Sequence, residues 1–209
     1  MSENLSLILI HGLGQNPSSW NAVISYLPQN TQIHCFNLCS FANTNEVTYK
    51  KLYRAFENYC ENMSGRIMLC GLSLGAILAM NYAIDHPKKI TKLILMAPQY
   101  KIPRFLFDLQ AVLFRFMPSR AFRIGFDKEQ TICLTRSMRT LDFSQTISRI
   151  SCPTLVICGE NDQANRKAAK ELASLIPNAA LCFISEAGHE VNIDTPKTLS
   201  DAMLSFCQE

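Results

Sequence analysis

Six short apolar runs recur along this chain, and stretches with helical character lie between them. Short runs bounded by turn residues and rich in β-branched side chains predict strands. The predicted strands are Leu5–Ile10, Gln32–Phe36, Arg66–Cys70, Leu93–Met96, Thr154–Cys158 and Leu181–Ile184. Strands that are apolar throughout and alternate with helices form parallel sheets covered on both faces. The sequence therefore predicts an α/β fold, with a mostly parallel six-stranded sheet and helices on both of its faces.

The segments between the runs predict the helices. These are Trp20–Leu27, Val47–Met63, Leu74–Asp85, Asn165–Leu175 and Thr198–Phe206. Pro87 and Pro177 follow two of them, as expected where a helix cannot continue. A chain of 209 residues suits one domain, which we expect to span residues 1–209.

Residues 101–149 interrupt this alternation, because no convincing buried strand occurs between the fourth and fifth runs. We predict a helical lid inserted there. The segment holds nine basic and four acidic residues, so it carries +5 while the rest of the chain carries −2. Its aromatic stripe, Phe105–Phe116, is expected to pack onto the core and roof a pocket.

The overall charge and the amino-terminal segment exclude several classes of protein. Twenty Lys and Arg stand against 17 Asp and Glu, a balance too even for a nucleic-acid binder, so we expect no nucleic-acid partner. The run Leu5–Ile10 is too short to cross a membrane. Glu3 and Asn4 stand where a signal peptide would be basic, so a cytoplasmic protein is expected.

Nine cysteines are present, and most lie inside apolar stretches, as buried reduced thiols do. Cys35 and Cys39 have three residues between them, and no Cys-x-x-Cys pair or neighbouring Cys/His pair predicts zinc. We therefore expect no metal site. The oligomeric state stays open.

The strongest signal for chemistry is Gly71-Leu72-Ser73-Leu74-Gly75, between the third predicted strand and the following helix. With Gly and Ser each near 7% of residues, chance predicts about 0.07 such matches in a chain of this length. A nucleophile on a sharp, strained turn needs small neighbours where backbone segments come close. Ser73 is thus a candidate nucleophile, although serine is also favoured as a plain helix N-cap.

A serine nucleophile needs a base, and the base needs a carboxylate that orients it. Asp162 and His189 each follow a predicted strand, and parallel strands end at one shared edge of the sheet. Three residues far apart in sequence can therefore converge. Glu160, Asp194 and Asp201 compete for the acid role, and Glu160 is the fallback.

Two backbone N–H groups are candidates for an oxyanion hole. One belongs to Leu74, directly after the candidate nucleophile. The other belongs to Leu13 in the early His11-Gly12-Leu13-Gly14 turn, where we expect the His11 ring to be structural. His34 and His86 are expected to have no catalytic role, because a proton-shuttling histidine needs a partner.

These features together resemble the α/β-hydrolase superfamily over nearly the whole chain. Ser73, Asp162 and His189 follow in the family's order, after the His-Gly loop. The resemblance implies a serine hydrolase that cleaves a small ester through an acyl-enzyme, with no cofactor. A small-molecule ester is the partner it implies.

The Asn16–Trp20 stretch and Ala187-Gly188-His189 look like the small single-domain esterase and acyl-hydrolase branch of that superfamily. Two departures follow from the sequence. The family's usual amino-terminal strand pair is missing, so we expect a minimal six-stranded sheet. The insertion at 101–149 sits where the family carries its lid, but it is short.

Three alternative interpretations stay open. The basic insertion could direct the same triad to a carboxylate-bearing substrate, as in a lyase or carbon–carbon bond enzyme resembling one of menaquinone biosynthesis. The chain could also be a ligand-binding relative without turnover. Finally, a basic amphipathic lid could contact a membrane surface.

Overall fold

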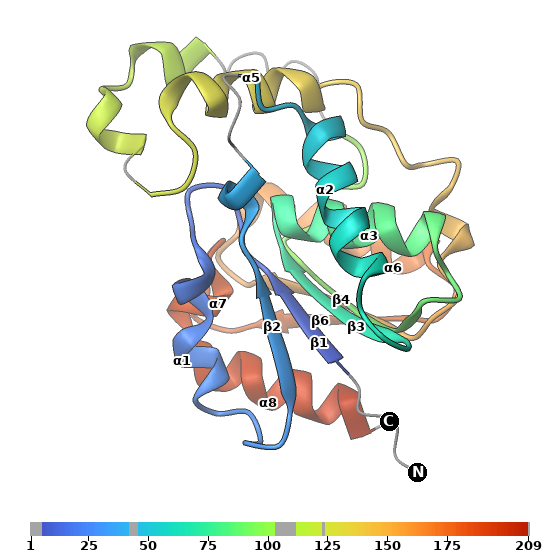
Figure 1. Ribbon diagram of the computed structural model, residues 1–209. Coiled ribbons are helices and arrows are strands. Elements are labelled where there is room, and N and C mark those ends of the chain that lie inside the picture. Colours follow the sequence, from blue (N-terminus) through green and yellow to red (C-terminus); the bar gives the residue numbers. More distant parts are fainter. Residues whose placement is uncertain (1–5, 42–45, 103–111, 123, 209) are drawn as a thin grey trace.

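The computed structural model describes residues 6–41, 46–102, 112–122 and 124–208 (Figure 1). A six-stranded sheet with the order β2-β1-β3-β4-β5-β6 forms its centre. The strands are β1 (Ser6–Ile10), β2 (Gln32–Phe36), β3 (Ile67–Leu72), β4 (Ile90–Met96), β5 (Thr154–Gly159) and β6 (Ala179–Ile184). Every pairing is parallel, which confirms the predicted fold class.

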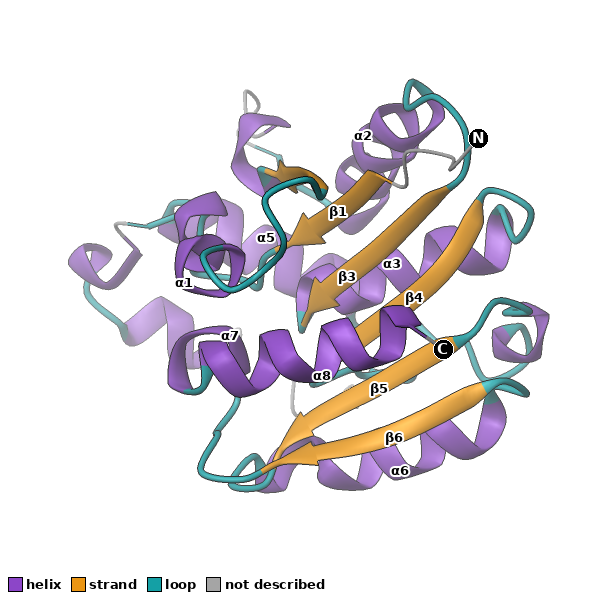
Figure 2. Ribbon diagram, turned by 90° about the horizontal axis from the view of Figure 1, so that it is seen from below, coloured by secondary structure: helices purple, strands orange, loops and turns teal. Residues whose placement is uncertain are grey.

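Helices cover both faces of the sheet (Figure 2). The helices are α1 (Asn21–Ile24), α2 (Tyr49–Glu61), α3 (Leu74–Asp85), α5 (Lys128–Met138), α6 (Gln163–Leu175), α7 (Val191–Asp194) and α8 (Pro196–Gln208). Short 3-10 turns are η1 (Pro17–Trp20), η2 (Leu38–Phe41), η3 (Ser119–Phe122) and η4 (Ile147–Arg149). In Figure 2, α8 lies in front of the strands, and α3 and α6 lie behind them.

Alternate residues of β1 show why the strands are apolar throughout. Ile8 and Ile10 belong to the core beneath α2, α3 and α6. Leu7 and Leu9 belong to the opposite core, beneath α1 and α8. Because successive side chains of a strand point to opposite faces, a strand between two cores must be apolar at every position.

The helix ends follow local sequence signals. The side chain of Thr48 caps α2 by accepting a hydrogen bond from the Lys51 N–H, 3.4 Å away. The stretch predicted as Trp20–Leu27 is instead η1 followed by the four-residue α1. Pro28 disfavours helical geometry in the residue before it, which shortens that helix. The short helix α7 was not predicted.

The described part of the insertion lies over the carboxyl edge of the sheet, with α5 at the top of Figure 1. Residues 112–116 are helical, and Asp127 begins α5 with a reciprocal capping box to Gln130. Lys101 pairs with Asp142 in an isolated antiparallel bridge, so the two ends of the insertion meet. Of the predicted aromatic stripe, residues 103–111 lie outside the described residues. The lid boundaries at 101 and 149 stay a prediction.

No helix in the described part of the chain is both long enough and apolar enough to cross a membrane.

Helix α3 crosses β1 at Gly75, where a side chain has no room. A Cβ there would overlap the carbonyl oxygen of Ile10 and lie 2.8 Å from that of His11. A Cβ on Gly12 would have its nearest neighbours at 3.6 Å, an ordinary contact. An added methyl group should therefore destabilise the fold much more at Gly75 than at Gly12.

We predict that Gly75→Ala lowers the free energy of unfolding by about 3 kcal/mol or more, because overpacking against backbone atoms cannot be relieved by a rotamer change. Gly12→Ala, the matched control, should change it by less than about 1 kcal/mol. Urea denaturation of both variants measures the difference. Equal denaturation midpoints for the two variants would contradict the close-approach argument.

Candidate active site

Ser73 occupies a sharp turn between β3 and α3. Its backbone has φ 53° and ψ −111°, a region that residues with a side chain rarely adopt. Its N–H donates to the Met96 carbonyl at 2.9 Å, and its carbonyl accepts from the Ile77 N–H at 3.0 Å. A Cβ at Gly71 would overlap the backbone of Gly75. The turn is thus held in a strained form by close packing on both sides.

Asp162 and His189 are joined by a hydrogen bond. His189 Nδ1 lies 2.9 Å from Asp162 Oδ2, although the two residues are 27 positions apart in the sequence. Asp162 follows β5 and is only 7% exposed, whereas His189 follows β6 and is partly exposed. The shared sheet edge brings them together, as the parallel topology predicts.

The hydrogen bond between Asp162 and His189 shifts the pKa of both groups. Burial alone would raise the pKa of Asp162, but hydrogen bonds from His189 and Asn165 leave that pKa below its ordinary value. The hydrogen bond to Asp162 raises the pKa of His189 against the opposing effect of burial, and the charges of Asp162 and Glu190 add to the rise. The carboxylate is therefore charged, and the imidazole is a stronger base than an exposed histidine.

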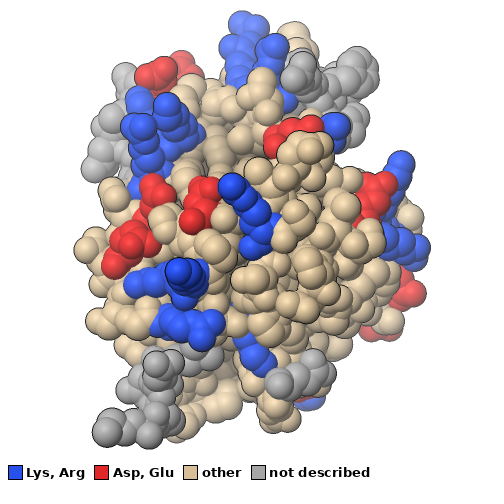
Figure 3. Space-filling view, turned by 90° about the vertical axis from the view of Figure 1, so that its right-hand side faces the viewer, with Lys and Arg blue, Asp and Glu red and all other residues tan. Residues whose placement is uncertain are grey.

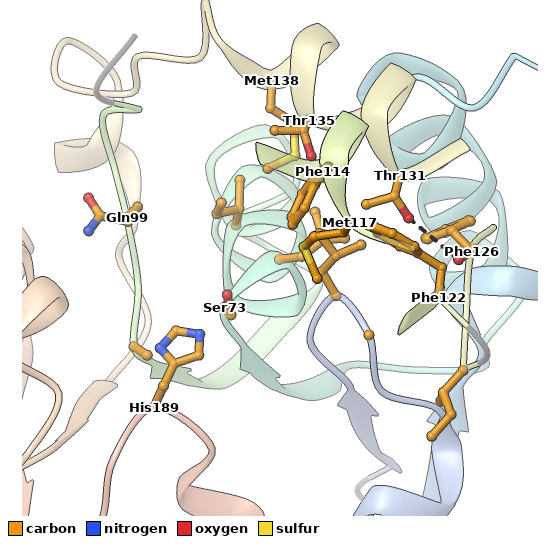
Figure 4. A pocket seen from close by; sticks show the side chains of 16 residues that line it. Ser73, Gln99, Phe114, Met117, Phe122, Phe126, Thr131, Thr135, Met138 and His189 are labelled. Atoms are coloured by element: carbon orange, nitrogen blue, oxygen red, sulfur yellow. Dashed lines mark hydrogen bonds between the residues drawn. The ribbon is translucent and has the colours of Figure 1, made fainter. Parts of the chain in front are cut away.

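Ser73 and His189 line one cavity of about 350 Å³ (Figure 4). Phe114, Met117 and Phe122 of the insertion form much of its apolar wall. These positions support a roof over the pocket for the described part of the insertion. Such a volume lies near the lower end of the usual range for ligand sites.

Leu13 and Leu74 line the same cavity. Leu74 is the first residue of α3, so its N–H has no acceptor within the helix. Among the hydrogen bonds between described residues, none uses the N–H of Leu13 or of Leu74. Among the described residues, both predicted donors therefore lack an acceptor, and both belong to residues that line the cavity with Ser73.

His11 braces the loop that carries Leu13. Its ring is 1% exposed, and burial lowers its pKa. Nε2 accepts a hydrogen bond from the Leu38 N–H at 3.2 Å, so Nδ1 carries the proton and donates to the Gly12 carbonyl at 2.9 Å. The ring is structural, as expected.

The other three carboxylates considered for the acid role have different partners or positions. Asp194 accepts a hydrogen bond from the Gly188 N–H at 2.8 Å, which steadies the turn before His189. Asp201 pairs with Lys197 on α8 at 2.8 Å. Glu160 is exposed. Of the four candidate acids, Asp162 is the one that contacts His189.

Sequence reasoning missed three amides that support this site. The Nδ2 of Asn165 donates to both oxygens of Asp162, at 2.9 and 2.8 Å. Gln99 in turn donates to Asn165 Oδ1 at 2.7 Å. Gln15 donates to Glu190 Oε1 at 2.8 Å, which links the Leu13 loop to the residue after His189. The available signal was the position of Asn165 three residues after Asp162, in the first turn of a helix.

All nine cysteines are free thiols. Within the described residues, no cluster of three or more His, Cys, Asp or Glu side chains is arranged to hold a metal ion. His34 does not line the described cavity, and His86 pairs with Glu57 at 2.8 Å between α2 and α3.

A family model described as alpha/beta hydrolase family matches residues 7–202. The chain belongs to the alpha/beta hydrolase family.

The chain is similar to one relative compared by sequence and to two solved structures. "Putative carbamate hydrolase RutD" of Escherichia coli O44:H18 (strain 042 / EAEC) is 24% identical over 238 aligned positions, which cover 95% of this chain and 88% of the relative. The enol-lactonase of Burkholderia xenovorans LB400 superposes with a TM-score of 0.87 at 20% identity, over 98% of this chain and 92% of that one. A thermophilic esterase of Thermogutta terrifontis superposes with a TM-score of 0.79 at 20% identity, over 98% and 89%. At such identities the structural likeness shows the fold.

Glu190 provides a test of the electrostatics around His189. We predict that Glu190→Gln lowers the pKa of His189. The variant keeps a side chain of nearly the same size but removes a negative charge that favours the imidazolium. Proton NMR titration of the imidazole, assigned with His189→Ala, measures the shift. Asp201→Asn is the matched control on α8 and should leave the titration unchanged. An unchanged or higher pKa in Glu190→Gln would contradict this account.

Proposed function

We propose that the protein is a serine hydrolase that cleaves a small, uncharged carboxylic ester through an acyl-enzyme. The observation that carries the proposal is the hydrogen-bonded Asp162–His189 pair, which opens onto the same cavity as Ser73. The strained turn of Ser73 supports it, because strain of this kind gathers at functional sites.

The proposed reaction has two steps. His189 accepts the proton of the Ser73 hydroxyl while Oγ attacks the ester carbonyl carbon, and the N–H groups of Leu13 and Leu74 stabilise the oxyanion. The bond to the leaving oxygen then breaks, and His189 gives its proton to the departing alcohol. Water repeats the sequence on the acyl-enzyme, which releases the acid and restores Ser73. Asp162 keeps the imidazole oriented throughout.

The lining of the cavity favours a neutral acyl group. Phe114, Met117, Phe122 and Met138 contribute apolar surface, and none of its described lining residues is Lys or Arg. A Lys or Arg would favour the carboxylate of a lyase substrate, and these described residues supply neither, which favours the esterase interpretation. The face drawn in Figure 3 also has basic and acidic side chains interspersed rather than gathered by sign.

We also propose that the protein works in the reducing cytoplasm, because nine unpaired thiols are typical of proteins kept in that compartment.

An ester panel tests the proposed function. Wild type should hydrolyse p-nitrophenyl esters of short acyl chains, and Ser73→Ala and His189→Ala should each lower kcat by about 10³-fold or more. Initial rates of p-nitrophenolate release measure this, and circular dichroism checks that both variants fold. A wild type that is inert across the whole panel, or variants that keep wild-type rates, would overturn the proposal.

Phe114 tests the roof of the acyl cavity. Phe114→Ala should move the preferred acyl length upward, because removing the ring enlarges the apolar wall beside Ser73. The ratio of kcat/KM for octanoate and butyrate esters is the readout. Phe116→Ala is the matched control, since that ring is 84% exposed and does not line the described cavity. An unchanged chain-length profile in Phe114→Ala would contradict the assignment of this wall.

A further inference from the structure

Gln99 lies between two cavities. It lines the apolar cavity that contains Ser73 and His189. It also lines a neighbouring groove of about 570 Å³, whose walls come from the ends of the insertion and from α6. A substrate that reached from Ser73 into this groove would pass Gln99.

A chain of hydrogen bonds fixes which way this amide points. Asn165 uses Nδ2 to donate to the charged Asp162, so its Oδ1 is left to accept. Gln99 fills that need with Nε2, at 2.7 Å. Its Oε1 is therefore the atom left over, and among the described residues no donor bonds to it. Gln99 thus offers an oriented acceptor at the border of the two cavities.

The leaving group of the proposed reaction lies on the same side. His189 must give a proton to the leaving oxygen, so the departing alcohol sits on its side of Ser73. Figure 4 shows Gln99 and His189 to one side of Ser73, and Phe114, Met117 and Phe122 to the other. Asp162 links Asn165, and through it Gln99, to His189, because its carboxylate accepts from both Asn165 Nδ2 and His189 Nδ1. The acyl chain would then face the aromatic rings and the alcohol would face Gln99.

The groove beyond Gln99 suits a neutral polar group. Lys101 pairs with Asp142 at 3.2 Å, and Lys167 pairs with Glu171 at 3.8 Å. The hydroxyl of Tyr100 also donates to Glu171, at 2.9 Å. Arg139 also lines the groove. The lining therefore offers both donors and acceptors, which suits the hydroxyl groups of a neutral alcohol.

We propose that Gln99 is a specificity-determining residue whose Oε1 accepts a hydrogen bond from a hydroxyl of the leaving alcohol. The favoured substrates are short-chain esters of neutral polyhydroxy alcohols, with the acyl chain in the apolar cavity and the alcohol in the groove. This inference rests on the proposed ester hydrolysis and names its substrate class.

A matched pair of esters tests it. Glycerol 1-butyrate carries two free hydroxyls, and its 2,3-di-O-methyl ether keeps the oxygens but cannot donate. Wild type should prefer the first by about fivefold or more in kcat/KM, the effect of one neutral hydrogen bond. Gln99→Met should bring the ratio close to one, and Gln99→Ala should do the same if the methionine variant folds poorly.

Each variant is compared on two esters. Any loss of kcat/KM that comes from disturbing Asn165 therefore cancels, because it affects both substrates. Gln145→Met is the matched control, since Gln145 is exposed and lines neither described cavity. It should keep the wild-type ratio. Butyrate release measures all rates.

Three results would overturn the inference while p-nitrophenyl esters are still hydrolysed. The first is a wild-type ratio near one, and the second is no hydrolysis of either glycerol ester. The third is a preference that survives in both Gln99 variants. If p-nitrophenyl esters are not hydrolysed either, the proposed function fails and this inference fails with it.

Discussion

The site depends on one steric constraint, the close crossing of α3 over the carboxyl ends of β1 and β3. Gly71 and Gly75 leave no room for side chains there, so the backbone between them turns sharply and holds Ser73 at positive φ. Such strain persists only where the surrounding packing over-determines it. Here two buried strands and an almost wholly buried helix supply that packing. The same crossing brings Ser73, Leu13 and Leu74 to one cavity wall.

A chain of amides and charges completes the arrangement on the other side of Ser73. Asp162 stays charged although buried, because His189 and Asn165 both donate to it. Gln99 then orients Asn165. Within this series of side chains, each residue forms a hydrogen bond with the next. Such pairing keeps the free-energy cost of burying polar groups low. The Asp162–His189 pair and the Gln99 wall of the cavity are therefore parts of one hydrogen-bond network, which is the physical basis for expecting Gln99 to influence substrate choice.

The sheet and the positions of the site residues followed from local sequence patterns. Apolar runs predicted all six strands, because the inner strands lie between two cores and even the half-buried edge strands β2 and β6 keep an apolar face. The shared edge of a parallel sheet predicted that Asp162 and His189 meet. The supporting roles of Asn165 and Gln99 did not follow, since they depend on side-chain directions across two different strand ends. The four-residue α7 was also missed, because so short a helix has almost no periodicity. In the insertion, the apolar residues predicted a roof, but which rings line the cavity is decided by packing that no sequence pattern encodes.

The proposed function depends above all on the activation of Ser73 by His189. Labelling with a fluorophosphonate probe, followed by peptide mapping, tests it most directly because the probe needs no knowledge of the natural substrate. The account predicts rapid modification at Ser73 in wild type and labelling slowed by about 10³-fold in His189→Ala. A wild-type protein that stays unlabelled, or that is labelled equally fast without His189, would contradict it.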